Sequence, residues 1–463
     1  MRPKSIAVTI FALTVLSLGR QSAPQEARPA HPAPALSNKG SAMEPADPDL
    51  IPEARRLLDY MVSVQGKGII AGVSRKGPFP AALQASGREP ALFGTDFYGW
   101  SRKYDERYHA NVKAEMARCQ DWWQTRGGIV QVHYHWGMPT QINGAAWAGR
   151  NARKSLDLAK TVTPGTEEYR AFFDDLKVTA DYLQQLAEAR VPVLWRPFHE
   201  IDGNWFWWTD AEKPENTAAL WRQMFQYLVK ERKIHNLIWV YNAAHRANKF
   251  EGMIRQNPNL TLADEIAYRR RFYPGPQYVD IASIDTYGNK RLGWGAPKDD
   301  ARRTAFELMQ GVAPGKPMAI GEDSGLLNPD IVMKEKTPWL YTMAWWVNDR
   351  PWTHYALNHD FMITLDELPL LMEGNVAPSV GIVAPADGQA LGAGAVEVTG
   401  FASDRNGNLA KVAVFALSDG WMDWRDFSQE AVGKELEERS RRLGEASLDA
   451  QGRWSFALKD VPP

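Results

Sequence analysis

Two glutamates in this 463-residue chain each follow an apolar run with the character of a buried strand. Glu200 follows the run 191–198 and precedes the loop 205–208, which holds three tryptophans and whose aromatic surface suits a general acid. Glu322 ends a second apolar run, 317–322. A retaining glycosidase uses two carboxylates about 5–5.5 Å apart, one as acid/base and one as nucleophile. The pair therefore predicts hydrolysis of glycosidic bonds, provided that the fold brings the two carboxylates together.

Other roles for these residues stay open at the level of the sequence. Glu200 could instead form a buried ion pair with Arg196, and Asp323, next to Glu322, is a rival nucleophile. The His-Glu pair also matches the start of the zinc motif H-E-x-x-H, but Gly203 occupies the position of the second histidine. We therefore predict that the reaction needs no metal and no cofactor.

Short apolar runs alternate with amphipathic stretches through most of the chain. The eight runs are 68–73, 90–97, 129–135, 191–198, 237–242, 279–287, 317–322 and 341–347. This alternation predicts a parallel sheet covered by helices, and eight such units fit a (β/α)8 TIM barrel. A doubly wound open sheet is the alternative, weakened by the lack of a GxGxxG motif after the first run. In a barrel, Glu200 and Glu322 both lie on the rim formed by the C-terminal strand ends.

The N-terminal segment has the pattern of an export signal. Arg2 and Lys4 precede an apolar run, 6–18, which is too short to span a membrane. We predict a signal peptide over residues 1–22 and a secreted protein, extracellular or periplasmic, with no membrane insertion after signal removal. Residues 23–48 are rich in proline and alanine and predict a flexible linker.

Two folded domains are expected beyond the linker. Residues 49–374 hold the eight alternating units and form the predicted catalytic domain. Residues 378–463 hold short alternating runs separated by turns, which predict a small immunoglobulin-like β-sandwich. We expect this sandwich to be incomplete, because such domains usually have about 100 residues.

The composition favours a neutral partner. The chain has 54 Lys+Arg against 55 Asp+Glu, so no charge excess attracts nucleic acid. Its 19 tryptophans outnumber the 17 phenylalanines and 15 tyrosines. The flat apolar face of tryptophan suits packing against the C–H face of a sugar ring, although a tryptophan-rich core is the simpler explanation. Cys119, the single cysteine, is expected to be a buried apolar residue.

These residues together resemble glycoside hydrolase family 26, whose members are mostly β-mannanases. The resemblance covers about 51–373, and its most specific part is the sequence Trp-Arg-Pro-Phe-His-Glu at 195–200 followed by Gly-Asn-Trp-Phe-Trp-Trp at 203–208. It implies a retaining barrel enzyme with Glu200 as acid/base and Glu322 as nucleophile. The implied substrate is β-mannan or a related neutral polysaccharide, which such an enzyme would cut internally.

The resemblance also implies hydrogen-bonding residues around the reacting sugar. Tyr287 corresponds to a tyrosine that hydrogen-bonds the nucleophile, here Glu322. His135 corresponds to a histidine that lines the sugar subsite beside the cleavage point. His199 precedes the acid/base and is expected to hydrogen-bond a sugar hydroxyl. Strand alternation places His133 on the same side as His135, without a role that the resemblance implies.

Aromatic residues complete the implied site. Trp205 corresponds to the aromatic residue that flanks the leaving group. Either Trp345 or Trp346 forms the platform under the reacting sugar, and the other is expected to pack in the core. Asp96 and Trp100 are weaker subsite candidates.

Two alternatives to a β-mannanase stay open. The sequence 321–325 departs from the pattern usual around the family's nucleophile, so mixed-linkage β-glucan and β-1,3-xylan remain candidate substrates. A non-catalytic carbohydrate-binding protein on the same barrel is the second alternative. The presence of both Glu200 and Glu322 favours an enzyme.

Overall fold

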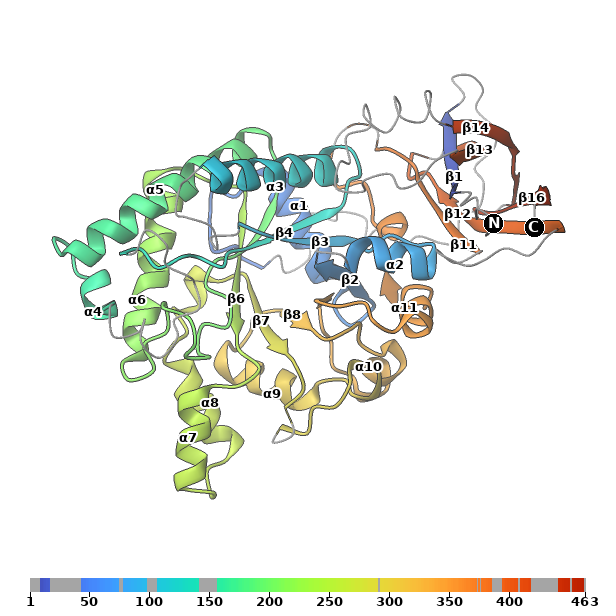
Figure 1. Cartoon of the computed structure of the whole chain (residues 1–463). Coiled ribbons are helices and arrows are strands. Elements are labelled where there is room, and N and C mark those ends of the chain that lie inside the picture. The colour runs from blue at the N-terminus through green and yellow to red at the C-terminus, as the bar shows by residue number, and fades with distance from the viewer. Residues whose placement is uncertain are drawn as a thin grey trace, which may run out of the picture.

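A parallel barrel and two small antiparallel sheets make up the computed structural model (Figure 1). It describes residues 9–16, 43–74, 78–97, 106–140, 156–289, 292–372, 374, 376–384, 394–406, 409–417, 440–449 and 452–461. The barrel runs from blue to orange in Figure 1, and the C-terminal sheets, in orange and red, lie at one side of it. This arrangement confirms the predicted fold class.

Eight parallel strands follow one another around the barrel in sequence order, and the last pairs with the first. They are β2 (Ile69–Ser74), β3 (Leu92–Asp96), β4 (Ile129–His133), β5 (Val193–Arg196), β6 (Leu237–Ala243), β7 (Ile281–Thr286), β8 (Met318–Asp323) and β9 (Tyr341–Ala344). A short strand, β10 (Met362–Ile363), adds to β2 in parallel. Each of the eight predicted runs overlaps one barrel strand, and closure of the sheet rules out the open alternative.

Helices cover the outside of the sheet (Figure 1). They are α1 (Pro52–Val64), α2 (Pro78–Ser86), α3 (Glu106–Gln124), α4 (Leu158–Thr161), α5 (Glu167–Glu188), α6 (Pro214–Phe225), α7 (Asn248–Gln256), α8 (Leu262–Arg270), α9 (Arg303–Val312), α10 (Pro329–Glu335) and α11 (Arg350–Leu357). The Thr166 side chain caps α5, and Pro214 begins α6, where a missing N–H costs nothing. In the described part of the chain, no helix is long and apolar enough to cross a membrane.

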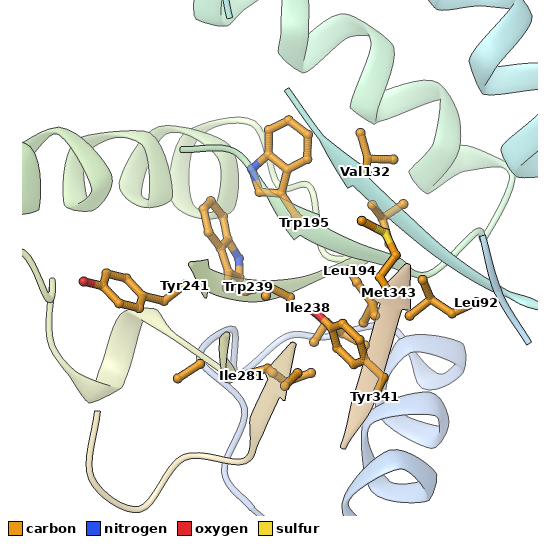
Figure 2. Packing of buried hydrophobic residues seen from close by; sticks show 14 of the residues in the cluster. Leu92, Val132, Leu194, Trp195, Ile238, Trp239, Tyr241, Ile281, Tyr341 and Met343 are labelled. Atoms are coloured by element: carbon orange, nitrogen blue, oxygen red, sulfur yellow. The ribbon is translucent and has the colours of Figure 1, made fainter. Parts of the chain in front are cut away.

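The strands are buried on both faces, because side chains point alternately to the barrel interior and to the helices. Trp239 on β6 packs against Trp221 and Phe225 of α6, with ring centroids 5.8 and 4.9 Å apart. Its neighbour Ile238 points the other way, toward Tyr341 (Figure 2). Among the residues that the structure describes, six tryptophans are fully buried: Trp136, Trp195, Trp208, Trp221, Trp239 and Trp339. Many of the tryptophans therefore pack in the core. Cys119 is also buried, as predicted.

The C-terminal sheets are antiparallel, as expected for the region beyond residue 378. One has the order β11 (Ser379–Ala384), β12 (Gly394–Ser403), β16 (Arg453–Val461), β15 (Ser447–Leu448), and the other β1 (Thr9–Leu16), β13 (Leu409–Leu417), β14 (Ser440–Glu445). A small core holds them together: Val398, Ala402, Val412, Val414 and Trp454. Strand β1 lies within the predicted signal peptide and pairs with β13. The immunoglobulin-like character of this region, its completeness and the signal peptide stay predictions.

Contacts near each end attach the flanking segments to the barrel. The backbone N–H of Ala46, inside the predicted linker, donates to Asp280 Oδ1 at 2.7 Å. At the other end, the Arg405 guanidinium donates to the carbonyl oxygens of Gly127 and Leu368 at 3.1 and 3.4 Å. The chain is thus anchored to the barrel from residue 46 onward.

Candidate active site

The two candidate carboxylates lie on the same rim of the barrel, joined by a shared set of hydrogen bonds. Glu322 is on β8, and Glu200 lies four residues after the end of β5. The backbone N–H of Glu200 donates to Asn242 Oδ1 at 2.7 Å, and Arg196 Nη1 donates to the same oxygen at 2.8 Å. Arg196 Nη2 in turn donates to Glu322 Oε1. The fold therefore brings together the two glutamates that the sequence singled out.

Arg196 is the centre of this set of bonds. Its guanidinium is fully buried, and Nη1 lies 3.1 Å from Asp285 Oδ1 and 3.2 Å from Oδ2. A buried guanidinium needs carboxylate partners to offset the loss of hydration. Those partners are Asp285 and Glu322, so the alternative ion pair between Arg196 and Glu200 is wrong.

A β-bulge sets the direction of Glu322. Ile284 on β7 pairs with Ile320 on β8, but the next residue, Asp285, pairs with Glu322, which leaves Gly321 as the extra residue. A Cβ atom at position 321 would lie 2.5 Å from Asn242 Nδ2 and 2.8 Å from Asp285 Oδ1. Only glycine fits there, and the bulge turns Glu322 toward Arg196.

Glu322 is held in its ionised form. Burial by itself would raise the pKa of its carboxyl, but the charge and hydrogen bond of Arg196 and the hydrogen bond from Tyr287 outweigh burial, and the pKa lies below the ordinary value. Tyr287 OH donates to Glu322 Oε2 at 2.5 Å, which is the contact expected from the sequence. Burial and the charge of Glu322 raise the pKa of the Tyr287 hydroxyl, so it stays protonated and keeps donating.

Asp323, the rival nucleophile, is occupied elsewhere. Its fully buried carboxylate accepts hydrogen bonds from Arg302 Nε and Nη2 at 3.1 and 3.0 Å and from Thr286 Oγ1 at 2.6 Å. The backbone N–H of Ser324 donates to Oδ1 at 2.6 Å. These bonds anchor the end of β8 and leave the neighbouring Glu322 to face the cleft.

Both oxygens of Glu200 have close neighbours. Trp205 Nε1 donates to Oε2 at 2.7 Å, so the predicted leaving-group aromatic also orients the carboxyl. His245 Nδ1 lies 3.3 Å from Oε1. The Glu200 backbone has a φ of 50°, a strained value that turns the chain sharply after β5. His245 was not predicted from the sequence, although it lies two residues after the end of β6 and therefore at the same rim.

Two histidines pair beside the carboxylates. His135 Nδ1 lies 2.7 Å from Asp96 Oδ2, and the His135 backbone N–H donates to Asp96 Oδ1 at 2.9 Å. His135 Nε2 and His199 Nε2 are 3.2 Å apart. The structure thus brings together the two predicted sugar-binding histidines and the weaker candidate Asp96. Trp100 lies outside the described residues.

Behind this pair, His133 is fully enclosed. Only 1% of its surface is exposed, and burial lowers the pKa of its imidazole to about 3. Burial likewise lowers the pKa of His199, whereas Asp96 raises that of His135 against the opposing effect of burial. His133 and His199 are therefore neutral imidazoles at the pH of an ordinary assay.

Trp345 and Trp346 both follow the end of β9; neither is fully buried, although Trp345 packs against the edge of the core. Strand β9 ends at Ala344, so strand alternation no longer applies to the two residues that follow. The Trp345 ring is half-buried, with its centroid 5.4 Å from that of His133. The Trp346 ring is 45% exposed and lies 5.4 Å from that of Tyr287.

The loop after Glu200 divides its aromatic residues between site and core. Phe206 lies against His199, with ring centroids 4.7 Å apart. Trp207 and Trp208 are buried, and their indole N–H groups donate to the carbonyl oxygens of Trp136 and His199 at 2.7 and 3.1 Å. These two tryptophans hold the loop in place, whereas Trp205 donates a hydrogen bond to the Glu200 carboxyl.

A polar hollow of about 430 Å³ opens next to Glu200. It is lined by His245, Arg246, Asn248, Glu251, Arg255, Gly288 and Asn289. His245 connects this hollow to the Glu200 carboxyl. The space is large enough for sugar units on the Glu200 side of the cleft.

Known proteins share this sequence and architecture. Residues 46–367 match the sequence profile of glycosyl hydrolase family 26. A mannan endo-1,4-beta-mannosidase of Thermothelomyces thermophilus is 28% identical over 337 residues, covering 70% of this chain and 62% of that protein. Mannan endo-1,4-beta-mannosidase B of Piromyces sp is 28% identical over 344 residues, covering 70% of this chain and 53% of that protein. The matched part of the chain therefore spans only between half and two thirds of these relatives.

A solved structure aligns with the barrel. It is a beta-mannanase from a symbiotic protist of the termite Reticulitermes speratus, complexed with gluco-manno-oligosaccharide. The two chains are 29% identical, with a TM-score of 0.56, and the alignment covers 70% of this chain and 97% of that one.

The buried bonds of Asp323 predict a structural role. Asp323→Asn leaves the Arg302 guanidinium with Asp300 as its remaining carboxylate partner, which should lower the free energy of unfolding by about 1.5–3 kcal/mol, the contribution of a hydrogen bond to a charged group. Urea unfolding followed by circular dichroism measures this loss. Asp174→Asn, which removes an exposed ion pair with Lys177, is the control and should change it by at most about 1 kcal/mol. A stable but inactive Asp323→Asn variant would instead assign chemistry to Asp323.

Proposed function

Because the chain belongs to glycosyl hydrolase family 26, we propose that it is a retaining endo-β-1,4-mannanase acting on β-mannan-type polysaccharides. The main observation in support is that Glu322 lies on the same rim as Glu200. Arg196 and Tyr287 keep its carboxylate ionised. The names of the relatives and the gluco-manno-oligosaccharide bound by the termite-symbiont enzyme support the substrate class.

The first step forms a covalent intermediate. Glu322 attacks the anomeric carbon while Glu200 donates its proton to the glycosidic oxygen, so the bond between that carbon and oxygen breaks and the leaving sugar departs as an alcohol. In the second step Glu200, now a carboxylate, takes a proton from water as the water attacks the same carbon. Glu322 is released as a carboxylate, and the product keeps the configuration of the substrate.

The surroundings of each carboxyl suit its role. As the glycosyl bond forms, Glu322 loses its charge, and Arg196 keeps Asp285 as its partner. The Arg196 charge is therefore never left unpaired during the reaction, which keeps the free-energy cost of the covalent intermediate low. Trp205 Nε1 holds one oxygen of Glu200 and fixes the direction from which the proton is delivered.

Sugar binding is proposed for the groups around the two carboxylates. Trp345, beside the histidines, forms the platform under the reacting sugar, and His135 and His199 hydrogen-bond its hydroxyls. Trp346, exposed next to Tyr287, offers a second flat face along the cleft. Trp205 flanks the leaving sugar, which enters the hollow near His245.

Export is part of the proposal. The charged and apolar pattern over residues 1–22 supports a cleaved signal peptide and an extracellular or periplasmic enzyme. The single cysteine, Cys119, is buried in the barrel, so the domain depends on its core for stability. The C-terminal sheets would then act as a spacer next to the catalytic domain.

The substrate assignment is tested by incubating purified protein with galactomannan, glucomannan, mixed-linkage β-glucan and β-1,3-xylan and measuring new reducing ends. We expect hydrolysis of the two mannan-type polymers and a fast fall in viscosity, which internal cleavage produces. Hydrolysis of only the glucan or the xylan would contradict the substrate. Release of monosaccharide without loss of viscosity would contradict endo cleavage.

Glu322→Ala should lower the rate by at least about a thousandfold, because no other side chain attacks the anomeric carbon. Azide should restore part of the turnover and give a glycosyl azide of inverted configuration, detected by NMR. Glu307→Ala, an exposed glutamate on α9, is the control and should behave like wild type. Unchanged activity in Glu322→Ala would move the nucleophile elsewhere.

Glu200→Ala should slow polysaccharide cleavage by about 10²–10⁴-fold, because a poor leaving group needs the proton. Aryl glycosides with good leaving groups need little protonation, so formation of their intermediate should slow much less. Pre-steady-state release of the phenol separates the two steps. Equal losses on both kinds of substrate would argue against an acid/base role for Glu200.

Tyr287→Phe removes one donor to ionised Glu322 while keeping the ring. The pKa of Glu322 should rise, since the lost hydrogen bond favoured the ionised carboxylate. Activity needs the ionised carboxylate, so the acidic limb of the profile of kcat/KM against pH should move to higher pH. Tyr355→Phe, at an exposed tyrosine bonded to Asp330, is the control and should leave that limb in place. An unmoved limb in Tyr287→Phe would mean that Tyr287 does not set the Glu322 pKa.

A further inference from the structure

Three groups with metal-binding atoms gather at the ends of β3 and β4. Asp96 ends β3, His133 ends β4, and His135 follows two residues later. Asp96 and His133 are direct partners in the register of the two parallel strands. One carboxylate oxygen and one nitrogen from each imidazole all lie within 4.8 Å of one another.

His133 lacks the partner that a buried polar group requires. The imidazole is 1% exposed, and within the part of the chain that the structure describes neither of its nitrogens has a hydrogen-bond partner. Leaving a buried polar group without a partner destabilises the fold. His133 Nε2 points toward Asp96 and lies 3.8 Å from its Oδ2, too far for a hydrogen bond.

That separation is close to the spacing of two ligands on one metal ion. Zinc binds imidazole nitrogen and carboxylate oxygen at about 2.0–2.2 Å, which places two tetrahedral ligands about 3.4 Å apart. The distance of 3.8 Å between His133 and Asp96 needs only a small closure. The 2.7 Å contact between His135 Nδ1 and Asp96 Oδ2 has to open by more, to about the same 3.4 Å.

We propose that Asp96, His133 and His135 form a binding site for Zn²⁺ at the base of the cleft. Two imidazoles and one carboxylate are a ligand set that zinc uses in proteins with an open fourth position. In this chain the fourth position faces the cleft, since His135 and Asp96 are the partly exposed members and His133 is enclosed. The ion takes no part in the hydrolysis, for which the two glutamates suffice.

Zinc at this position inhibits the enzyme. His135 is the residue proposed to hydrogen-bond the reacting sugar, and an ion on its Nδ1 both turns the ring and fills the space beside it. Substrate and zinc therefore compete. This consequence rests on the proposed function, whereas zinc binding itself does not.

Binding is measured on the full chain after EDTA treatment, with Co²⁺ absorption spectra and Zn²⁺ calorimetry. We expect one equivalent of Co²⁺ with visible d–d bands, displaced by Zn²⁺. His133→Asn should weaken Zn²⁺ binding at least about tenfold, and Asp96→Asn is a second variant in case the first does not fold. Absence of Co²⁺ bands, or an unchanged Zn²⁺ affinity in the folded variants, would overturn the site.

A second cluster supplies the control. Asp47, Asp49 and His235 also group three ligand atoms, but Asp47 Oδ2 and His235 Nδ1 already pair at 2.8 Å. His235→Asn should leave the Zn²⁺ affinity unchanged, and loss of binding in that variant would place the ion there instead.

Activity provides an independent readout. EDTA should not lower hydrolysis of galactomannan, and Zn²⁺ should raise KM without changing kcat in the wild type. The KM of the His133→Asn variant should no longer respond to Zn²⁺. If Zn²⁺ binds as described but no polysaccharide is cut, the proposed function fails and the site stands. If galactomannan is cut and Zn²⁺ does not bind, the site fails and the function stands.

Discussion

The buried charge of Arg196 is the constraint on which the site depends. A guanidinium without access to water has to be paired, and its partners come from three other strands, in the form of Asn242, Asp285 and Glu322. Pairing fixes the relative height of β5, β6, β7 and β8 at the rim. The same bonds hold Glu322 ionised and, through Asn242, position the backbone of Glu200. Stability and chemistry are thus served by a single network, and neither can change without the other.

Aromatic residues have two roles in this barrel. Those that face the helices, such as Trp239, fill the layer between sheet and helices, where their large area contributes most to the hydrophobic effect. Those past the strand ends, such as Trp205 and Trp345, lie against polar groups of the candidate site: Trp205 donates to Glu200, and Trp345 lies beside His135. The tryptophans therefore belong both to the core and to the candidate site.

The candidate site was only partly predictable from residue types. Glu200 and Glu322 were found because each stands at the end of an apolar run, where a barrel puts its reactive groups, and Tyr287 was found through the resemblance to the family. His245 and Asn242 carry no comparable signal, since each gains its role from a neighbour on another strand. Neither of the tryptophans at 345–346 is fully buried, because both follow the end of β9 and strand alternation no longer directs one of them inward.

The sequence by itself determined the barrel, because eight apolar runs alternating with amphipathic stretches have few other ways to bury their surface. It also determined which glutamates meet, because parallel strands bring their C-terminal ends to one rim. Only the tertiary structure decided the pairings across that rim. Whether Arg196 meets Glu200 or Glu322 depends on strand register and on the bulge at Gly321, which shifts the pairing by one residue. Contacts between residues on different strands form only when the sheet closes, so they cannot be predicted from local patterns in the chain.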